Sequence, residues 1–325
     1  MTHIDWDYLR DYPLSGSLGF NYPFLSEISP RDAIFNSRKK QAKSISNALK
    51  FVDPDLSSQL ASCCSSLEFR YDEELNIKLF RANFCRSRIC PLCMGRKSAI
   101  WAAKALKGLP NLKNDYPTAR FLFLTLTIKN CPIHELRSTI KLLVQGWRKL
   151  TNDCKSCWSD WRWPAIGYIK SVEVTRGSDG SAHPHLHALL LVPENYFSRH
   201  HYIQHHRWRE IWQRAMMLKY EPFVNIKAVP IMSEHKSILE IIKYEIKIPD
   251  LTASAQFTSQ YVRECKRLKF FTSGGLLRQY FKFSEEEDLL HGLNKKKHFY
   301  DSTAAPDVSF VWNDQVNQYA LFNYG

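Results

Sequence analysis

The segment Lys170–Val192, KSVEVTRGSDGSAHPHLHALLLV, decides the fold because it contains two β-rich runs joined by a turn. The first run covers Tyr168–Thr175 and is followed by Gly177–Gly180, a sequence that is typical of a tight turn. A second run begins at about His185 and ends at Val192. The sequence therefore predicts an antiparallel hairpin at this point of the chain.

The segments around the hairpin alternate between strand and helix patterns. The run FLFLTLTI, Phe121–Ile128, is typical of a buried strand. Apolar residues then recur every three or four positions between Ile133 and Leu150, which predicts an amphipathic helix. We expect a further strand at Val224–Val229 and further helices near Arg38–Phe51, Trp208–Leu218 and Ser237–Ile248. Strands mixed with helices but joined by a hairpin favour an α+β fold with an antiparallel sheet over a doubly wound parallel sheet.

Changes in composition divide the chain into four expected parts. We predict a partly helical N-terminal arm at 1–55, a cysteine-rich module at 56–110, the α+β domain at 115–285 and a C-terminal tail at 286–325.

The charge balance points to a polyanionic partner. The 325 residues include 45 Lys and Arg against 32 Asp and Glu, a formal net charge of +13, which favours nucleic acid, although charge that serves only solubility gives the same balance. No apolar run approaches the length of a membrane span, and the first residues lack the pattern of a secretory signal. We therefore expect a soluble, cytoplasmic protein with no membrane partner.

The histidines of the hairpin form the most informative motif. Residues two apart on a strand share a face, so His185 and His187 point together while Leu186 packs behind them. Glu173 lies on the partner strand and can supply an oxygen ligand. Two imidazoles and one carboxylate predict a divalent metal site with open positions, whereas the alternative is that these are ordinary hydrogen-bonded strand residues.

A second motif lies on the predicted helix Ser237–Ile248. Glu240 and Tyr244 are four residues apart and would share one face, which Lys243 and Lys247 extend. A tyrosine hydroxyl can act as a nucleophile, with Glu240 as base and a lysine to neutralise phosphate. Taken alone, this pattern is more often structural.

The cysteines predict a zinc site, because disulfides are rare in a reducing cytosol. Cys85, Cys90 and Cys93, together with Cys63 or Cys64, can supply four thiolates. The alternatives are buried free thiols, or a site that instead uses the second pair, Cys154 and Cys157.

Several motifs in order resemble the replication initiator (Rep) proteins of small rolling-circle plasmids, the single-tyrosine branch of the HUH endonuclease superfamily. The motifs are CRSRICPLC, FLFLTLT, HPHLH with its preceding glutamate, ExxKYxxKxxD (Glu240 to Asp250) and Gly274-Gly275-Leu276, and they span about residues 60–285. The resemblance implies an antiparallel-sheet HUH nicking domain flanked by helices, preceded by the cysteine-rich zinc module.

The resemblance also implies a role for each site residue. His185, His187 and Glu173 would hold Mg²⁺ or Mn²⁺, and His183 would support these ligands or contact DNA rather than bind the metal, since Pro184 interrupts the strand alternation. Tyr244 would attack the scissile phosphodiester, and Glu240 would activate water for the terminating cleavage. Lys243 and Lys247 would contact DNA. The zinc ligands would be Cys64, Cys85, Cys90 and Cys93, since the family has a single cysteine at the position of Cys63 and Cys64.

The implied activity is nicking of one strand at a plasmid origin, giving a 5′-phosphotyrosyl link and a free 3′-OH primer, and a second cleavage that ends replication. The implied partners are origin DNA, single-stranded or extruded at the nick, and a host helicase and polymerase; whether the chain acts as a homodimer stays open. The alternatives are a zinc-containing DNA-binding regulator without catalysis and a related HUH relaxase or transposase.

Overall fold

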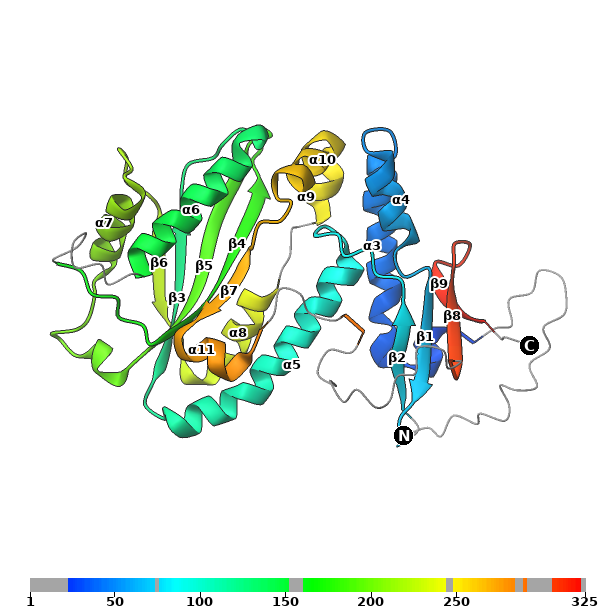
Figure 1. Ribbon diagram of the computed structural model, residues 1–325, viewed down its shortest axis with the longest axis horizontal. Coiled ribbons are helices and arrows are strands. Elements are labelled where there is room, and N and C mark those ends of the chain that lie inside the picture. The colour runs from blue at the N-terminus through cyan, green and yellow to red at the C-terminus, as the bar shows by residue number, and fades with distance from the viewer. Residues whose placement is uncertain are drawn as a thin grey trace, which may run out of the picture. The chain divides into compact units, whose positions relative to one another are not determined.

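The computed structural model (Figure 1) describes residues 23–73, 76–151, 160–243, 248–283, 289–290 and 306–322. The chain divides into two compact units. The first unit combines Met1–Cys93 with Asp288–Gly325, and the second unit is Met94–Glu287. The boundary at Cys93 falls in the first turn of helix α5 (Pro91–Asp115).

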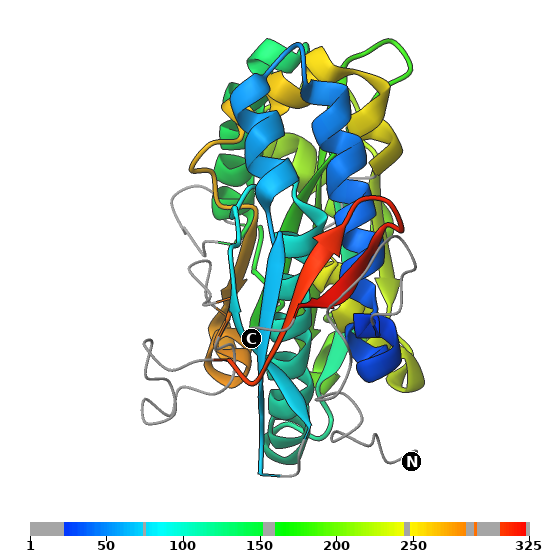
Figure 2. The ribbon, with the colours of Figure 1, turned by 90° about the vertical axis from the view of Figure 1, so that its right-hand side faces the viewer.

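The first unit is an antiparallel sheet with helices on one side, as Figure 2 shows. The sheet has the order β2-β1-β8-β9, and its strands are β1 (Ser66–Tyr71), β2 (Ile77–Ala82), β8 (Val308–Asn313) and β9 (Gln318–Phe322). Its helices are α2 (Leu25–Ile28), η1 (Pro30–Asp32), α3 (Ile34–Leu49) and α4 (Pro54–Ser62).

The C-terminal residues belong to this sheet, which differs from the expected tail at 286–325. Strand β8 pairs with β1, and the ring of Phe310 on β8 packs edge-on against Phe69 on β1 at 5.7 Å. Both rings are fully buried. The sequence did not reveal this arrangement because the two strands that pair are more than 200 residues apart.

The second unit is built on a five-stranded antiparallel sheet with the order β6-β3-β5-β4-β7. The strands are β3 (Arg120–Thr127), β4 (Gly167–Arg176), β5 (Ala182–Val192), β6 (Val224–Ala228) and β7 (Phe271–Gly274). Strands β4 and β5 form the predicted hairpin, and the turn between them places Gly180 at a φ of +82°. The α+β prediction, with an antiparallel sheet, is confirmed.

Alternation along the strands gives the sheet two different faces. One face is largely apolar, although it includes the buried Lys170, and it is covered by α6 (Leu136–Thr151) and α7 (His205–Met216). Helix α6 buries Trp147, whose ring lies edge-on to that of Trp163 at 5.5 Å, and α7 buries Trp208 and Trp212.

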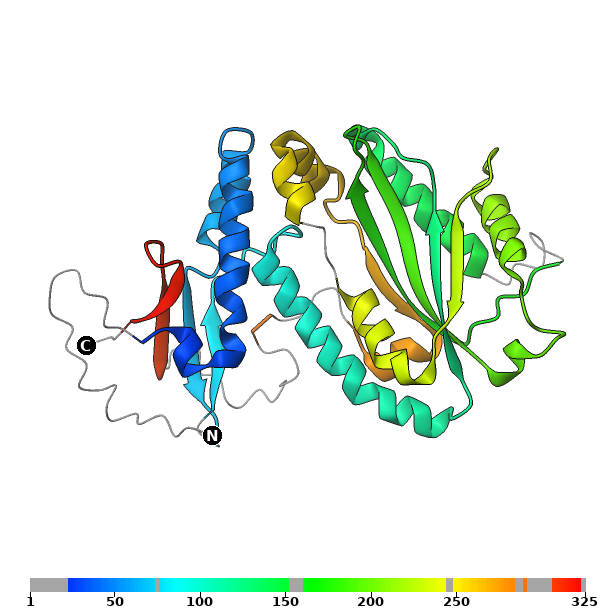
Figure 3. The same cartoon turned by 180° about the vertical axis from the view of Figure 1, so that it is seen from behind.

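The other face is apolar at one end only. There Phe121, Ile169, Leu189 and Leu191 pack under α5, α8 (Glu234–Ile242) and α11 (Gly275–Phe281). Figure 3 shows α5 and α8 crossing this end of the sheet, while the strands continue beyond them. At the other end, the same face carries the histidines and Glu173.

Helix α8 is shorter than the predicted Ser237–Ile248. It ends at Ile242, because Lys243 takes an extended conformation with ψ 97° and the hydroxyl of Ser98 on α5 donates to the carbonyl of Ile242 at 3.2 Å. Ile238, Ile241 and Ile242 are buried and anchor the helix on the sheet. The prediction that one helix carries Glu240 through Lys247 is therefore wrong.

The remaining elements of the second unit are short: η2 (Ile133–Glu135), η3 (Glu194–Phe197), η4 (Ile231–Ser233), α9 (Ile248–Ala253) and α10 (Ala255–Glu264). Among the described residues, no helix has both the length and the apolar character that a bilayer span requires.

Candidate active site

The hairpin register brings Glu173 and the two histidines together. Glu173 on β4 lies directly opposite His185 on β5, and His187 lies opposite Ser171. Because directly paired residues of an antiparallel ladder share a face, all three functional side chains project from the same side of the sheet. We call Glu173, His185 and His187 the metal triad.

The three side chains converge on one point. A single oxygen of Glu173, Oε2, lies 3.2 Å from Nε2 of His185 and 3.1 Å from Nε2 of His187. The side chains are 30%, 12% and 23% exposed, respectively, so the point of convergence is reachable from solvent. Hydrogen bonds from His185 and then His187 hold the pKa of Glu173 well below its usual range, so the carboxylate is ionised at neutral pH.

The Nδ1 atoms of His185 and His187 each contact an oxygen on the side of the ring away from Glu173. Nδ1 of His185 lies 3.3 Å from the carbonyl oxygen of His183, and Nδ1 of His187 lies 3.1 Å from the hydroxyl of Thr125 on β3. A carbonyl oxygen only accepts, so Nδ1 of His185 donates to it; if a cation took the place of the hydrogen bond between Nε2 and Glu173, the ring would be the Nδ1–H form with its lone pair on Nε2. This is the tautomer that a metal-binding histidine requires.

The donor set fits a divalent cation. Neighbouring ligands of an octahedral ion with bonds of about 2.1 Å lie ~3.0 Å apart, close to the observed nitrogen–oxygen separations of 3.1 and 3.2 Å. Two imidazoles and one carboxylate suit Mn²⁺ and related ions, and they leave positions for substrate oxygens.

His183 lies on the same face of β5, so the expected interruption of the strand alternation at Pro184 is wrong. Pro184 is paired within the strand opposite Val174, so the alternation continues through it. The ring of His183 lies 5.2 Å from that of His185, and its Nδ1 contacts Oδ1 of Asn130 at 2.6 Å. Burial lowers the pKa of His183, and His185 lowers it further.

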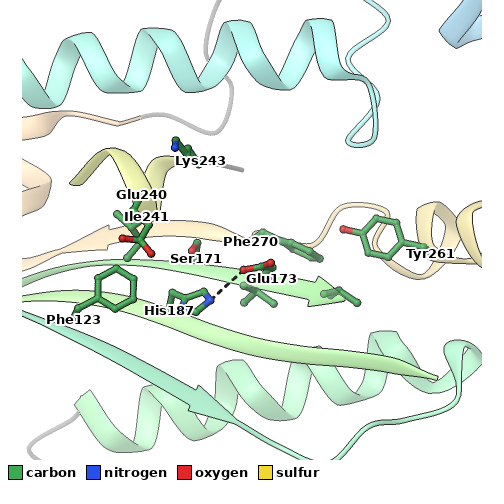
Figure 4. Close-up of a pocket in the computed structure, with 11 residues that line it drawn as sticks. Phe123, Ser171, Glu173, His187, Glu240, Ile241, Lys243, Tyr261 and Phe270 are labelled. Atoms are coloured by element: carbon green, nitrogen blue, oxygen red, sulfur yellow. Dashed lines mark hydrogen bonds and ion pairs between the residues drawn. The ribbon is translucent and has the colours of Figure 1, made fainter. Parts of the chain in front are cut away.

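A cavity of about 80 Å³ lies beside the metal triad, between the sheet and the end of α8 (Figure 4). Glu240 projects from α8 toward Phe123 and His187, and Lys243 follows at the end of the helix. Tyr261 on α10 and Phe270 close the side next to Glu173. The cavity thus combines a candidate base with the metal triad; Tyr244 and Lys247 lie outside the described residues.

Sequence reasoning missed several residues around the triad. Thr125 and Thr127 alternate with leucines in FLFLTLT, and a polar residue at every second position of a buried strand is a signal that they face a site. The sequence carries no such signal for Tyr261 or Asn130, since each reaches the site from a distant element.

The cysteine cluster lies in the first unit. The sulfurs of Cys63, Cys85, Cys90 and Cys93 all lie within 4.8 Å of one another. The pair Cys154 and Cys157 lies outside the described residues. The prediction that Cys64 is the fourth ligand is wrong, because the cluster contains Cys63 instead. Cys64 has a φ of +48°, which turns the backbone directly after α4. The sulfur of Cys64 lies 3.9 Å from that of Cys63 but is not one of the four sulfurs that lie within 4.8 Å of one another.

The cluster fits zinc. In a tetrahedral site with bonds of about 2.3 Å, neighbouring sulfurs lie ~3.8 Å apart; Cys63 lies 3.5 Å from Cys90 and 3.6 Å from Cys93, and Cys85 lies 3.8 Å from Cys93. Backbone N–H groups of Cys85 and Arg86 donate to the sulfurs of Cys63 and Cys93.

Comparison with known proteins identifies the family. The sequence model described as "Replication protein", Rep_1, matches residues 76–320. The chain is 31% identical over 279 residues to "Protein rep" of Lactiplantibacillus plantarum, covering 80% of this chain and 86% of the relative. It is 30% identical over 267 residues to "Protein rep" of Lentilactobacillus hilgardii (78% and 83%), and 29% identical over 281 residues to that of Streptococcus pneumoniae serotype 2, strain D39 (83% and 85%).

No solved structure matches the chain significantly. The chain therefore belongs to the Rep_1 family of replication proteins, the plasmid rolling-circle initiators that its histidine hairpin and neighbouring motifs resemble.

Proposed function

We propose that this initiator nicks one strand of its plasmid origin with Tyr244 as nucleophile and the metal triad as the phosphate-activating site. The observation that carries the proposal is the convergence of Nε2 of His185 and His187 on one oxygen of Glu173, beside a cavity that Glu240 lines. A divalent cation bound there, Mg²⁺ or Mn²⁺, would polarise the scissile phosphate.

The first cleavage exchanges one phosphodiester for another. The phenolic oxygen of Tyr244 forms a bond to phosphorus, the bond from phosphorus to the 3′ oxygen breaks, and the proton that the phenol loses is balanced by the one that the 3′ oxygen gains. The products are a 5′-phosphotyrosyl enzyme and a free 3′-OH, with no nucleotide consumed. A host polymerase would extend this primer while a host helicase separates the strands. Tyr244 follows the end of α8 by two residues, and Glu240, Ile241 and Lys243 at that end all line the cavity.

Glu240 would serve the second cleavage. Its carboxylate shares the cavity with His187 and Glu173, and about 80 Å³ is enough for a few water molecules. A water held there can give its proton to Glu240 as its oxygen bonds to phosphorus and the bond from phosphorus to the 3′ oxygen breaks; the 3′ oxygen takes up a proton, so the strand is cut without a second tyrosine. Lys243 and Lys247 would neutralise phosphate charge. Four cysteine thiolates, from Cys63, Cys85, Cys90 and Cys93, would hold a structural Zn²⁺.

The test is a covalent-adduct assay with origin-derived single-stranded DNA and Mn²⁺ or Mg²⁺. We expect a denaturation-resistant protein–DNA species with the native chain, its loss in Tyr244→Phe, and its retention in Tyr202→Phe, a matched change at an exposed tyrosine. Glu240→Ala should keep the first nick and impair the second.

Two outcomes would count against this assignment. If the native chain binds the DNA but forms no adduct with either metal, a zinc-containing DNA-binding regulator becomes the better description. If Glu240→Ala abolishes the first nick, the division of roles between Tyr244 and Glu240 is wrong.

A further inference from the structure

Strand β6 forms the edge of the sheet on the side of β3, and one row of its residues shares the face of the metal triad. Asn225 pairs with Thr125, and Lys227 pairs with Phe123. Thr125 and Phe123 are the two β3 residues that contact His187, through a hydroxyl at 3.1 Å and a ring at 5.7 Å. The register therefore places Asn225 level with His187, two strands away, and Lys227 level with Leu189 on the same face.

Phe223 continues this row toward His185. Its carbonyl oxygen accepts from both the backbone N–H and the hydroxyl of Thr127, at 3.2 and 2.9 Å. Thr127 is the direct partner of His185 on its other side. Phe223 thus lies two strand spacings, about 10 Å, from the strand that carries His185. We call Phe223, Asn225 and Lys227 the β6 strip.

The chemistry of the β6 strip suits a single nucleic-acid strand. Phe223 is 66% exposed, although it is a large aromatic side chain held in place by two hydrogen bonds to its backbone. Lys227 is exposed and Asn225 is partly exposed. An aromatic face for base stacking, an ammonium group for phosphate and an amide for hydrogen bonding are the components of single-stranded DNA sites.

The charges around the strip support the same partner. Lys129, at the end of β3, is exposed and lies over the ring of Tyr220 at 4.4 Å. The acidic residue nearest to the strip along the sequence is Glu221, and its carboxylate is paired with Arg209 at 3.1 Å. The strip therefore presents positive charge to an incoming polyanion.

We propose that the β6 strip binds the single-stranded DNA adjoining the scissile phosphate, with Phe223 stacking on a base and Lys227 contacting the backbone. The proposal rests on the proposed function for the identity of the scissile phosphate, but it concerns binding alone. It assigns substrate recognition to an edge strand that supplies no ligand of the metal triad.

The experiment measures binding without cleavage. In a Tyr244→Phe background, fluorescence anisotropy gives the Kd for an origin-derived single strand as a function of salt. We expect Phe223→Leu to raise the Kd about tenfold and Phe223→Trp to preserve it, because stacking needs an aromatic face rather than apolar area. Lys227→Gln should weaken binding and lower the slope of log Kd against log salt by about 0.7.

Matched controls separate the strip from general surface effects. Met232→Leu changes an apolar side chain that is 91% exposed on η4, and Lys141→Gln removes an exposed charge from α6 on the opposite face of the sheet. Neither should change the Kd by more than about twofold, and Mn²⁺ affinity should be unchanged in all of the variants.

The outcomes distinguish this proposal from the proposed function. If the Kd of the Phe223→Leu variant equals that of the protein with Phe223, or rises no more than that of Met232→Leu, the β6 strip is not the DNA site. This conclusion holds whatever the adduct assay gives. If the β6 variants lose affinity but the native chain never forms an adduct, the strip is a DNA site and the nicking function fails alone.

Discussion

At the scale of single residues, each candidate metal site depends on the direction in which particular side chains point. One oxygen of Glu173 meets two imidazoles because strand pairing fixes all three on one face. The choice between Cys63 and Cys64 is made instead by one backbone angle, the φ of +48° at Cys64. The shared face of the metal triad follows from a periodic pattern in the sequence, whereas the position of Cys63 in the cluster does not.

The two adjacent cysteines give a matched pair of variants. Cys63→Ala removes a sulfur that lies 3.5 and 3.6 Å from its neighbours in the cluster, so we expect loss of most of the bound zinc and a fall of about 3 kcal/mol or more in the free energy of unfolding of the first unit. Cys64→Ala should keep one zinc per chain. Zinc content of the purified proteins checks both. Equal loss in the two variants would mean that the ligand set differs from the cluster described.

At the scale of elements, the polar end of the sheet face is kept open because the helices over it stop short. Helix α8 ends at Ile242, where Ser98 binds its last carbonyl, and α11 starts from the Gly274-Gly275 junction after β7. Gly275 has a φ of +56°, and a Cβ there would lie 2.3 Å from the carbonyl oxygen of Ile166. Close approach of two backbones therefore sets where α11 begins.

Substitution at this junction should be costly. We expect Gly275→Ala to lower the free energy of unfolding by about 3 kcal/mol, since both the left-handed backbone and the contact with Ile166 oppose a side chain. Gly180→Ala is the control: its φ is +82°, but the nearest atom to a new Cβ is a guanidinium nitrogen at 3.7 Å, so about 1 kcal/mol is expected. Urea unfolding measures both values. Similar losses in the two proteins would show that the backbone contact contributes nothing.

At the scale of the whole molecule, each candidate metal site has its own unit. The cysteine cluster lies in the unit that combines both ends of the chain, and the metal triad lies in the unit between them. The C-terminal strands complete the first unit: Tyr319 on β9 is fully buried, and its hydroxyl donates to the carbonyl oxygen of Cys64 at 2.5 Å.

Removal of residues 306–325 should therefore affect one unit only. We expect β1 and β2 to lose protection in hydrogen–deuterium exchange, together with most of the zinc, because β1 loses its partner strand and Phe69 loses its contact with Phe310. Strands β3, β4 and β5 should remain protected, and Mn²⁺ should bind as before. Persistent protection of β1 would show that the C-terminal strands are accessory.

The sequence by itself determined the parts of the protein that repeat with a local period. Alternation in HPHLH and FLFLTLT predicted the strands and the shared face of His185 and His187, and the turn at Gly177–Gly180 predicted their pairing with the strand of Glu173. These features are local because strand and helix geometry fix the direction of each side chain relative to its neighbours.

Only the tertiary structure decided the features that depend on distant segments. The entry of Cys63 into the cluster depends on the left-handed backbone at Cys64, which no periodic pattern predicts. The pairing of β8 with β1, the end of α8 at Ile242 and the position of β6 two strands from His187 all follow from contacts between residues far apart in the chain. No local sequence pattern predicts such contacts. They form when elements that are distant in sequence pack together, bury apolar surface and pair one another's backbone groups.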